Sequence, residues 1–208
     1  MQNLPETQKD TDSFYNNTAE TWTGLHSIAS FWEDQMNKFQ ELLPHGIILE
    51  IGAGGGRDAY QLIKRGYDYL GIEPSEGLIK VAQRNNPDAA FENTHVEEIT
   101  YENKFTGFWA SASLLHHPKD KIDFALQKIN MALIPGAIGF ISLKKHVDGL
   151  PDERVVSGKL GDRFFSFWTE NDFTEVLKRN GFELAADVTE KTTSTDTWLV
   201  FLVRKLDL

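Results

Sequence analysis

Short apolar runs alternate with helix-spaced segments between residues 47 and 143, and this alternation constrains the fold more than any other feature. The runs 47–51, 69–72, 89–91, 108–113 and 137–143 have the length of strands. The segments between them place apolar residues three or four positions apart, as helices with one buried face do. Because parallel neighbours need crossover connections, this order predicts a parallel sheet with helices on both faces.

The last third of the chain adds an antiparallel element to this plan. The ranges 182–189 and 197–204 have strand composition and are joined by a turn-like segment at 191–196. The sequence therefore predicts an α/β fold with a mostly parallel seven-stranded sheet and a C-terminal antiparallel hairpin. A length of 208 residues fits one domain.

Three segments outside the alternating region have distinct patterns. Residues 1–12 have no apolar period and predict a flexible tail, so the domain is expected over 13–208. The range 13–46 is expected to form N-terminal cap helices, because apolar side chains recur there at helical spacing. The polar, glycine-containing range 144–168 is expected to form a substrate-side loop.

Composition narrows the classes of partner and chemistry. The 31 acidic and 21 basic side chains give a net charge of −10, which argues against nucleic acid and anionic lipid as partners. The absence of cysteine excludes disulfides, thiolate metal sites and a cysteine nucleophile. The six histidines show no metal-ligand spacing, so no metal is expected. No apolar run is long enough to span a bilayer, and the start is polar, so a cytoplasmic protein is expected.

The first strand runs directly into a glycine cluster. The strand expected over 47–51 is followed directly by Gly52. Gly54, Gly55 and Gly56 come next, before a helix. Glycines here allow positive φ and let a ligand approach the backbone at the carboxyl end of a strand, where open α/β sheets bind ligands. Glu73 ends the next strand, where a carboxylate can accept hydrogen bonds from the hydroxyls of an adenosine ribose.

Two nucleotide ligands fit such a loop. The dinucleotide fingerprint requires a small residue three positions after Gly54, but that residue is Arg57. Glu50 precedes the first glycine by two positions, and its charge would repel a pyrophosphate but attract an ammonium or sulfonium group. The pattern favours a cationic adenosine ligand over NAD.

These segments resemble the ordered motifs of class I S-adenosylmethionine-dependent methyltransferases. Residues 50–56 resemble the first motif and 71–75 the second, in which the acid holds the ribose. Residues 91–99 resemble the adenine-contacting segment, with His95 where an aspartate is usual, and 109–117 resemble the fourth motif. The range 15–20 is similar to the N-terminal segment that covers the cofactor. The resemblance implies a Rossmann-like three-layer sandwich, with S-adenosylmethionine as cofactor and S-adenosylhomocysteine as product.

The same resemblance identifies candidate residues. The expected cofactor-binding residues are Tyr15, Glu50, Gly52, Ala53, Gly54, Gly56, Arg57, Asp58, Glu73, Pro74, Ser75, His95, Val96 and Ser111. Arg57 and Asp58 either contact the methionine end of the cofactor, pair with each other or cap the helix. His116 and His117 follow the fourth strand and are candidate catalytic residues, because a neutral imidazole can accept a proton from an O–H or N–H nucleophile. Their alternative is a structural role at the strand end.

The resulting hypothesis is methyl transfer by in-line displacement to an O, N or S atom of a small molecule, or alternatively to carbon. Aromatic residues in the cap and loop regions could form a substrate wall that attracts a cation. A monomer or homodimer is expected. The rival hypotheses are a non-catalytic cofactor- or partner-binding domain of the same fold and an NAD(P)-dependent oxidoreductase.

Overall fold

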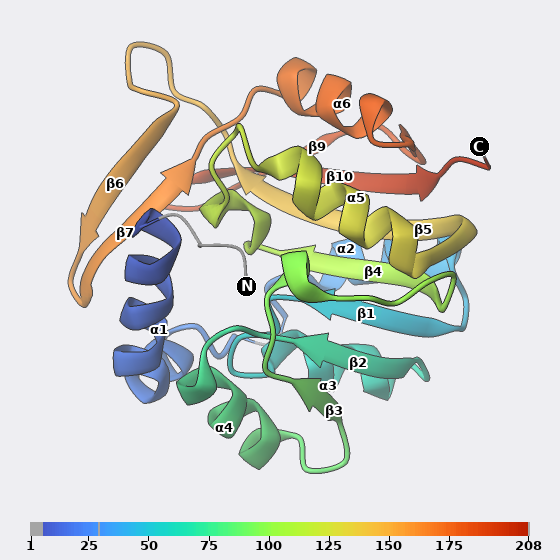
Figure 1. Ribbon diagram of the computed structural model, residues 1–208, viewed down its shortest axis with the longest axis horizontal. Helices are drawn as coiled ribbons and strands as arrows, with labels where there is room; N and C mark the ends of the chain where they lie inside the picture. The colour runs from blue at the N-terminus through green and yellow to red at the C-terminus, as the bar shows by residue number, and fades with distance from the viewer. Residues whose placement is uncertain (1–5, 29, 208) are drawn as a thin grey trace.

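The protein has three layers, with one large sheet between two sets of helices (Figure 1). The computed structural model describes residues 6–28 and 30–207, with side chains from residue 9 onward. Its α-helices are α1 (Glu6–Leu25), α2 (Glu33–Leu42), α3 (Arg57–Lys64), α4 (Glu76–Asn85), α5 (Ile122–Ala132) and α6 (Glu170–Arg179). Its short 3-10 helices are η1 (Val96–Glu98) and η2 (Leu114–His116).

The strands form one large sheet and one separate hairpin. They are β1 (Ile47–Ile51), β2 (Asp68–Ile72), β3 (Ala90–Glu92), β4 (Phe105–Ser111), β5 (Leu133–Lys144), β6 (Glu153–Gly158), β7 (Gly161–Ser166), β8 (Phe182–Leu184), β9 (Thr189–Thr192) and β10 (Thr197–Lys205). The large sheet has the order β3-β2-β1-β4-β5-β10-β8, with β9 also on β10. The strands from β3 to β5 are parallel and β10 is antiparallel to β5. This arrangement confirms the predicted Rossmann-like fold class.

The sheet differs from the prediction in one detail, because the strand expected over 182–189 is interrupted. Leu184 pairs with Val203 and Thr189 pairs with Val200, so four residues of one strand face two of the other. These extra residues form a bulge that divides the expected strand into β8 and β9. The described part of the sheet consequently has eight strands, and the C-terminal antiparallel pairing remains as expected.

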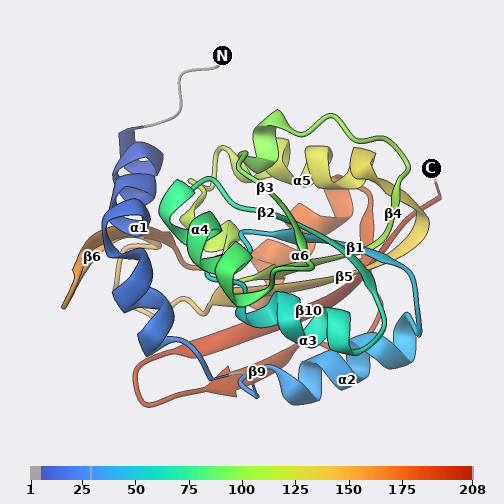
Figure 2. The same ribbon diagram turned by 90° about the horizontal axis from the view of Figure 1, so that it is seen from below.

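Helices pack on both faces of the sheet through apolar side chains (Figure 2). On one face, α2 contributes Phe39 and α3 contributes Leu62 to a cluster with Trp109, whose ring stacks on Phe140 at 3.7 Å. On the other face, α5 and α6 pack against residues of β1, β4 and β10. Burial of these apolar side chains is the main force that holds the layers together. Along the described helices, no stretch is both long and apolar enough to cross a bilayer.

Two predicted loop regions are ordered elements. Residues 6–12, expected within the flexible tail, form the first turns of α1, and residues 1–5 lie outside the described residues. The order of this segment is explained by the packing of α1 against α4 and β7, which buries Phe14 and Ala19 of the helix. The loop expected over 144–168 contains the hairpin of β6 and β7, in which Val155 and Val156 pair with Phe164 and Arg163. In Figure 1, α1 stands beside α4 and β7 at one end of the sheet.

Candidate functional site

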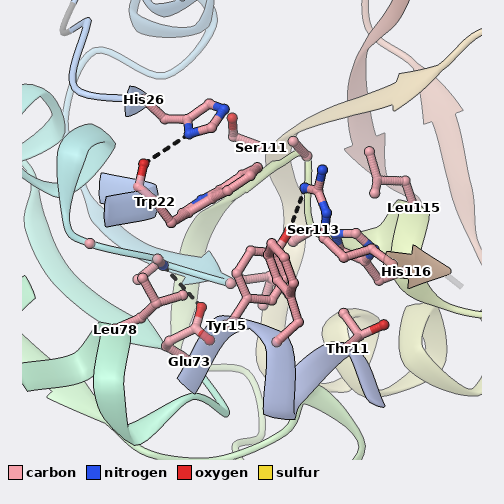
Figure 3. A pocket seen from close by; sticks show the side chains of 18 of the residues that line it. Thr11, Tyr15, Trp22, His26, Glu73, Leu78, Ser111, Ser113, Leu115 and His116 are labelled. Atoms are coloured by element: carbon pink, nitrogen blue, oxygen red, sulfur yellow. Dashed lines mark hydrogen bonds between the residues drawn. The ribbon is translucent and has the colours of Figure 1, made fainter. Parts of the chain in front are cut away.

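A cavity of about 610 Å³ opens where the carboxyl ends of β1, β2 and β4 meet. The segments after these strands form one wall, and α1 with the β6–β7 hairpin forms the opposite wall. Figure 3 shows the side chains of Tyr15, Trp22, Glu73 and His116 around this space. The cavity therefore lies at the edge of the sheet where parallel α/β folds bind ligands.

The glycine loop forms the floor of the cavity. Gly52 and Gly54 have φ values of +71° and +56°, in the left-handed region that glycine tolerates best. A Cβ on Gly52 would lie 2.5 Å from the Cβ of Ser113, so this glycine also allows the two segments to approach closely. A Cβ on Gly54 would meet no described atom within 4 Å. The backbone at Gly54 therefore faces open space.

Glu73 is buried beside this loop. Its carboxylate accepts hydrogen bonds from the backbone N–H of Gly54 at 3.0 Å and of Ser75 at 2.9 Å. Burial nevertheless raises the pKa of Glu73 to about 7, because the two hydrogen bonds only partly offset desolvation. Its orientation is fixed, and each oxygen has a further lone pair for a ligand.

Glu50 lies at the end of β1 and is also buried. It accepts a hydrogen bond from the hydroxyl of Tyr69. Burial, and next the charge of Asp58, raise the pKa of Glu50 well above its ordinary value. A cation placed beside Glu50 would stabilise its charged form. The structure thus has two buried acids that a positively charged, hydroxyl-bearing ligand could satisfy.

Arg57 and Asp58 pair with each other, which is one of the three alternatives considered from the sequence. The guanidinium of Arg57 donates from Nε to Asp58 Oδ1 at 2.6 Å and from Nη2 to Oδ2 at 2.9 Å. Nη2 also approaches Ser111 Oγ at 3.3 Å, and Trp109 Nε1 donates to Asp58 at 3.0 Å. Both members of the pair line the cavity. The ion pair therefore holds one positive and one negative charge close to Glu50, and both residues remain available for contact with a ligand in the cavity.

His116 has both ring nitrogens in hydrogen bonds. Nδ1 lies 2.7 Å from the carbonyl oxygen of Phe164, which can only accept, so Nδ1 carries the proton. Nε2 therefore accepts from the hydroxyl of Tyr15 at 2.9 Å. Burial, partly offset by the Phe164 hydrogen bond, lowers the pKa of His116 to about 3, and the charge of Arg163 adds to this. The imidazole is neutral, lines the cavity and accepts its hydrogen bond from Tyr15, which also lines the cavity.

His117 and His95 contact acids instead. His117 Nε2 lies 2.9 Å from Glu97 Oε1, and His95 Nε2 lies 3.3 Å from Asp12 Oδ2 on α1. His117 is also buried. These contacts favour the structural alternative for His117 and connect His95 to the N-terminal helix.

Most of the predicted site residues line the cavity. They are Tyr15, Glu50, Gly52, Ala53, Gly54, Arg57, Asp58, Glu73, Pro74, His95, Val96, Ser111, His116 and His117. Two residues expected in the site lie outside its lining. Gly56 is the N-cap of α3, and a Cβ there would lie 2.4 Å from Asn86 Nδ2 on the neighbouring segment. Ser75 is the buried N-cap of α4, and its hydroxyl accepts from Leu78 N–H at 3.1 Å.

Sequence reasoning missed Arg163 and Lys144, which also line the cavity. Both lie within the range 144–168 that was expected to form a loop. The signal was a pair of apolar doublets, Val155–Val156 and Phe164–Phe165, on either side of a glycine-bounded turn. Such a pattern is typical of a hairpin.

Comparisons with known proteins agree with this geometry. Residues 48–136 match the family model of a methyltransferase domain. No curated protein matches the sequence. One similar structure is 1,6-didemethyltoxoflavin-N1-methyltransferase from Burkholderia thailandensis, with bound 1,6-didemethyltoxoflavin and S-adenosylhomocysteine. It has a TM-score of 0.79 and 20% identity over 100% of this chain and 93% of that chain.

Two further structures are similar over nearly the whole chain. Magnesium protoporphyrin IX methyltransferase from Synechocystis PCC 6803, with bound S-adenosylmethionine, has a TM-score of 0.73 and 13% identity, covering 99% of this chain and 100% of that chain. A 4+2 cyclase has a TM-score of 0.75 and 16% identity, covering 98% and 97%. At these identities the likeness establishes the fold.

Proposed function

The chain carries a methyltransferase domain and has the Rossmann-like fold of class I S-adenosylmethionine-dependent methyltransferases, and from this premise we propose that it methylates an O, N or S atom of a small molecule. S-adenosylmethionine is its cofactor. The observation that best supports the proposal is the cavity that holds Glu50, the open backbone of Gly54 and Glu73 together. A cationic adenosine ligand can offer a positive charge and hydroxyl groups to these two buried acids. A pyrophosphate would place negative charge beside them, which is unfavourable.

The residues present fit the cofactor. Glu50 would hold the ammonium group, and its raised pKa would fall as the positive charge approaches. Glu73, already oriented by Gly54 and Ser75, would accept the ribose hydroxyls on its remaining lone pairs. Gly54 would let the amino-acid portion approach the backbone, because no described atom occupies the space beside its α-carbon.

When bound, the cofactor supplies a sulfonium methyl group that a nucleophile can take by in-line displacement. Because a sulfonium is a good leaving group, the main task of the chain is to orient the nucleophile in a dry pocket. Tyr15 on α1 would contact the acceptor, and His116 would position the Tyr15 hydroxyl. A pKa of about 3 makes His116 a weak base, so general-base catalysis contributes little. We therefore retain His116 as a positioning residue and assign His117 no chemical step.

Calorimetric titration with S-adenosylmethionine, S-adenosylhomocysteine and NAD tests the cofactor assignment. We expect micromolar-range binding of the first two and none of NAD. Binding of NAD alone would contradict the proposal and support the oxidoreductase hypothesis.

A second experiment tests turnover. A 4+2 cyclase has a similar fold, so the fold by itself does not determine the reaction. We expect labelled S-adenosylmethionine to transfer its methyl group to a component of a metabolite extract, with release of S-adenosylhomocysteine. Binding without transfer to any extract component would favour the non-catalytic domain.

A further inference from the structure

Arg163 is a cation without an acidic partner in the wall of the cavity. Its guanidinium carbon lies 4.4 Å from the ring centroid of Trp22, 4.9 Å from that of Phe14 and 5.1 Å from that of Phe165. Among the described side chains no acid forms an ion pair with Arg163, and its buried Nε has no hydrogen-bond partner. Arg57, in the same cavity, is paired with Asp58. A charged group in a cavity wall without an ionic partner is unfavourable, so an anion that pairs with its accessible nitrogens would bind favourably.

Charge is divided between the two sides of the cavity. Glu50, Asp58 and Glu73 lie on the side formed by β1, α3 and β2. Arg163 lies on the side formed by α1 and β7, and its positive charge acts on Tyr15 by lowering the pKa that burial raises. Lys144 is also on the lining, but its Nζ lies 2.8 Å from Asp196, which balances its charge. Asp12 on α1 also lines the cavity, but it lies 3.3 Å from His95. Arg163 is therefore a positive charge on this side of the cavity that no described acid pairs with.

The aromatic residues of the cavity already contact cations of the chain. Arg163 lies over three rings, Lys144 lies 4.5 Å from the ring centroid of Phe165, and Lys191 lies 5.2 Å from that of Phe31. A cationic acceptor would have to displace these side chains and approach their charges. The observed contacts therefore argue against the cation-attracting wall considered from the sequence.

We propose that Arg163 forms an acceptor subsite for a flat, apolar molecule that carries a carboxylate. Rings lie against the guanidinium and its Nε is buried, while Nη1 donates one of its two N–H groups to the Tyr15 hydroxyl at 3.4 Å. A ligand can therefore pair along the edge formed by Nη1 and Nη2. A planar carboxylate matches that edge with two parallel hydrogen bonds. The exposed side chains of Leu25 and Ile28 at the cavity lining provide apolar surface for the rest of the molecule.

This inference rests on the proposed methyltransferase function and specifies the class of its acceptor. An anionic acceptor beside a sulfonium is electrostatically favourable. It also suits the neutral, weakly basic His116, because an ionised acceptor arrives without a proton to remove. The carboxylate is either the group that is only recognised or the group that is methylated. In both cases it would pair with the same edge of the Arg163 guanidinium.

Three probes that share the naphthalene ring and differ in the charge of the substituent test the charge preference. The protein is saturated with S-adenosylhomocysteine and titrated calorimetrically with 2-naphthoate, 2-naphthamide and 2-naphthylmethylamine. We expect 2-naphthoate to bind at least tenfold more tightly than the amide and the amine. Absence of 2-naphthoate binding, or equal or tighter binding of either other probe, would overturn the inference.

Variants then assign the preference to Arg163. Arg163→Met keeps an apolar stem against the rings and should abolish the preference for 2-naphthoate, and Arg163→Lys should retain part of it. Arg154→Met is the matched control, because Arg154 is on the same hairpin, lies 3.6 Å from the ring centroid of Phe167 and is outside the cavity lining. It should keep the full preference. Thermal unfolding verifies that each variant is folded.

Further outcomes separate this inference from the proposed function. If the Arg163→Met variant keeps the preference, or loses affinity for S-adenosylhomocysteine as strongly as for 2-naphthoate, the carboxylate subsite is wrong. If the unsubstituted protein does not bind S-adenosylhomocysteine, the proposed function fails. The probe titration without cofactor then still determines whether Arg163 selects a carboxylate.

Discussion

Glu73 gives the sharpest quantitative prediction, because its pKa differs strongly between the folded and unfolded protein. Burial raises the pKa of Glu73 from 4.5 to about 7. In the cofactor-free folded state the carboxyl group therefore keeps a proton that the unfolded chain has already released. The folded protein loses stability as pH rises from about 4.5, and the loss is complete above the folded-state pKa of about 7.

The magnitude follows from these two pKa values. Relative to low pH, the difference between the two pKa values of Glu73 lowers the free energy of unfolding by about 1.4 kcal/mol at pH 5.5 and by about 3.4 kcal/mol at pH 8. The difference, about 2 kcal/mol, should be absent in Glu73→Gln, which has the same shape but does not titrate. The amide also changes the contacts with Gly54 and Ser75, but this effect does not depend on pH.

Urea unfolding of both proteins at pH 5.5 and 8 measures this difference. We expect the free energy of unfolding of the unsubstituted protein, relative to Glu73→Gln, to fall by about 2 kcal/mol between the two pH values. With saturating S-adenosylhomocysteine the fall should shrink, because ribose hydroxyls stabilise the ionised carboxylate. A stability difference that is the same at both pH values in the free protein would refute the reasoning.

The remaining predictions concern the cofactor half and Tyr15. Glu50→Gln should weaken S-adenosylmethionine binding at least tenfold and reduce the proton release on binding that calorimetry in two buffers detects, because the cation lowers the raised pKa of Glu50; equal proton release in both proteins would count against this role. Gly54→Asp should abolish S-adenosylhomocysteine binding while the circular dichroism spectrum is unchanged, since it places bulk and charge in the open space, and retained affinity would show that the ligand lies elsewhere. Tyr15→Phe and His116→Ala should lower methyl-transfer rates with cofactor affinity within about twofold; unchanged rates in both would leave the pair a structural role.

The local patterns of the sequence predicted which residues the structure brings together on the side of the cavity that holds Glu50 and Glu73. Three features on this side are local: the apolar run of β1, the glycines after it and the N-cap at Ser75. Each depends on residues close by in the sequence, so a short stretch of sequence is enough to predict it. Glu50 and Glu73 were predicted together because parallel strands bring their carboxyl ends to one edge.

The opposite half depends on contacts between distant parts of the chain. Tyr15 bonds His116 across 101 residues, and Arg163 bonds Tyr15 across 148 residues. No spacing rule links such positions. The β6–β7 hairpin was interpreted as a loop because its polar residues and glycines dominate the pattern, although the pairing of its two strands with each other orders it.

The position of the β6–β7 hairpin outside the main sheet has an evolutionary consequence. The family model matches residues 48–136, which supply Glu50 and Glu73, while α1 and the hairpin lie on either side of this range. Mutations in the hairpin can accumulate without disturbing the ladder from β3 to β10, so acceptor preference can diversify while the cofactor half is retained. Exchange of residues 153–166 between related proteins is accordingly the smallest graft that we expect to carry a change of acceptor from one protein to another.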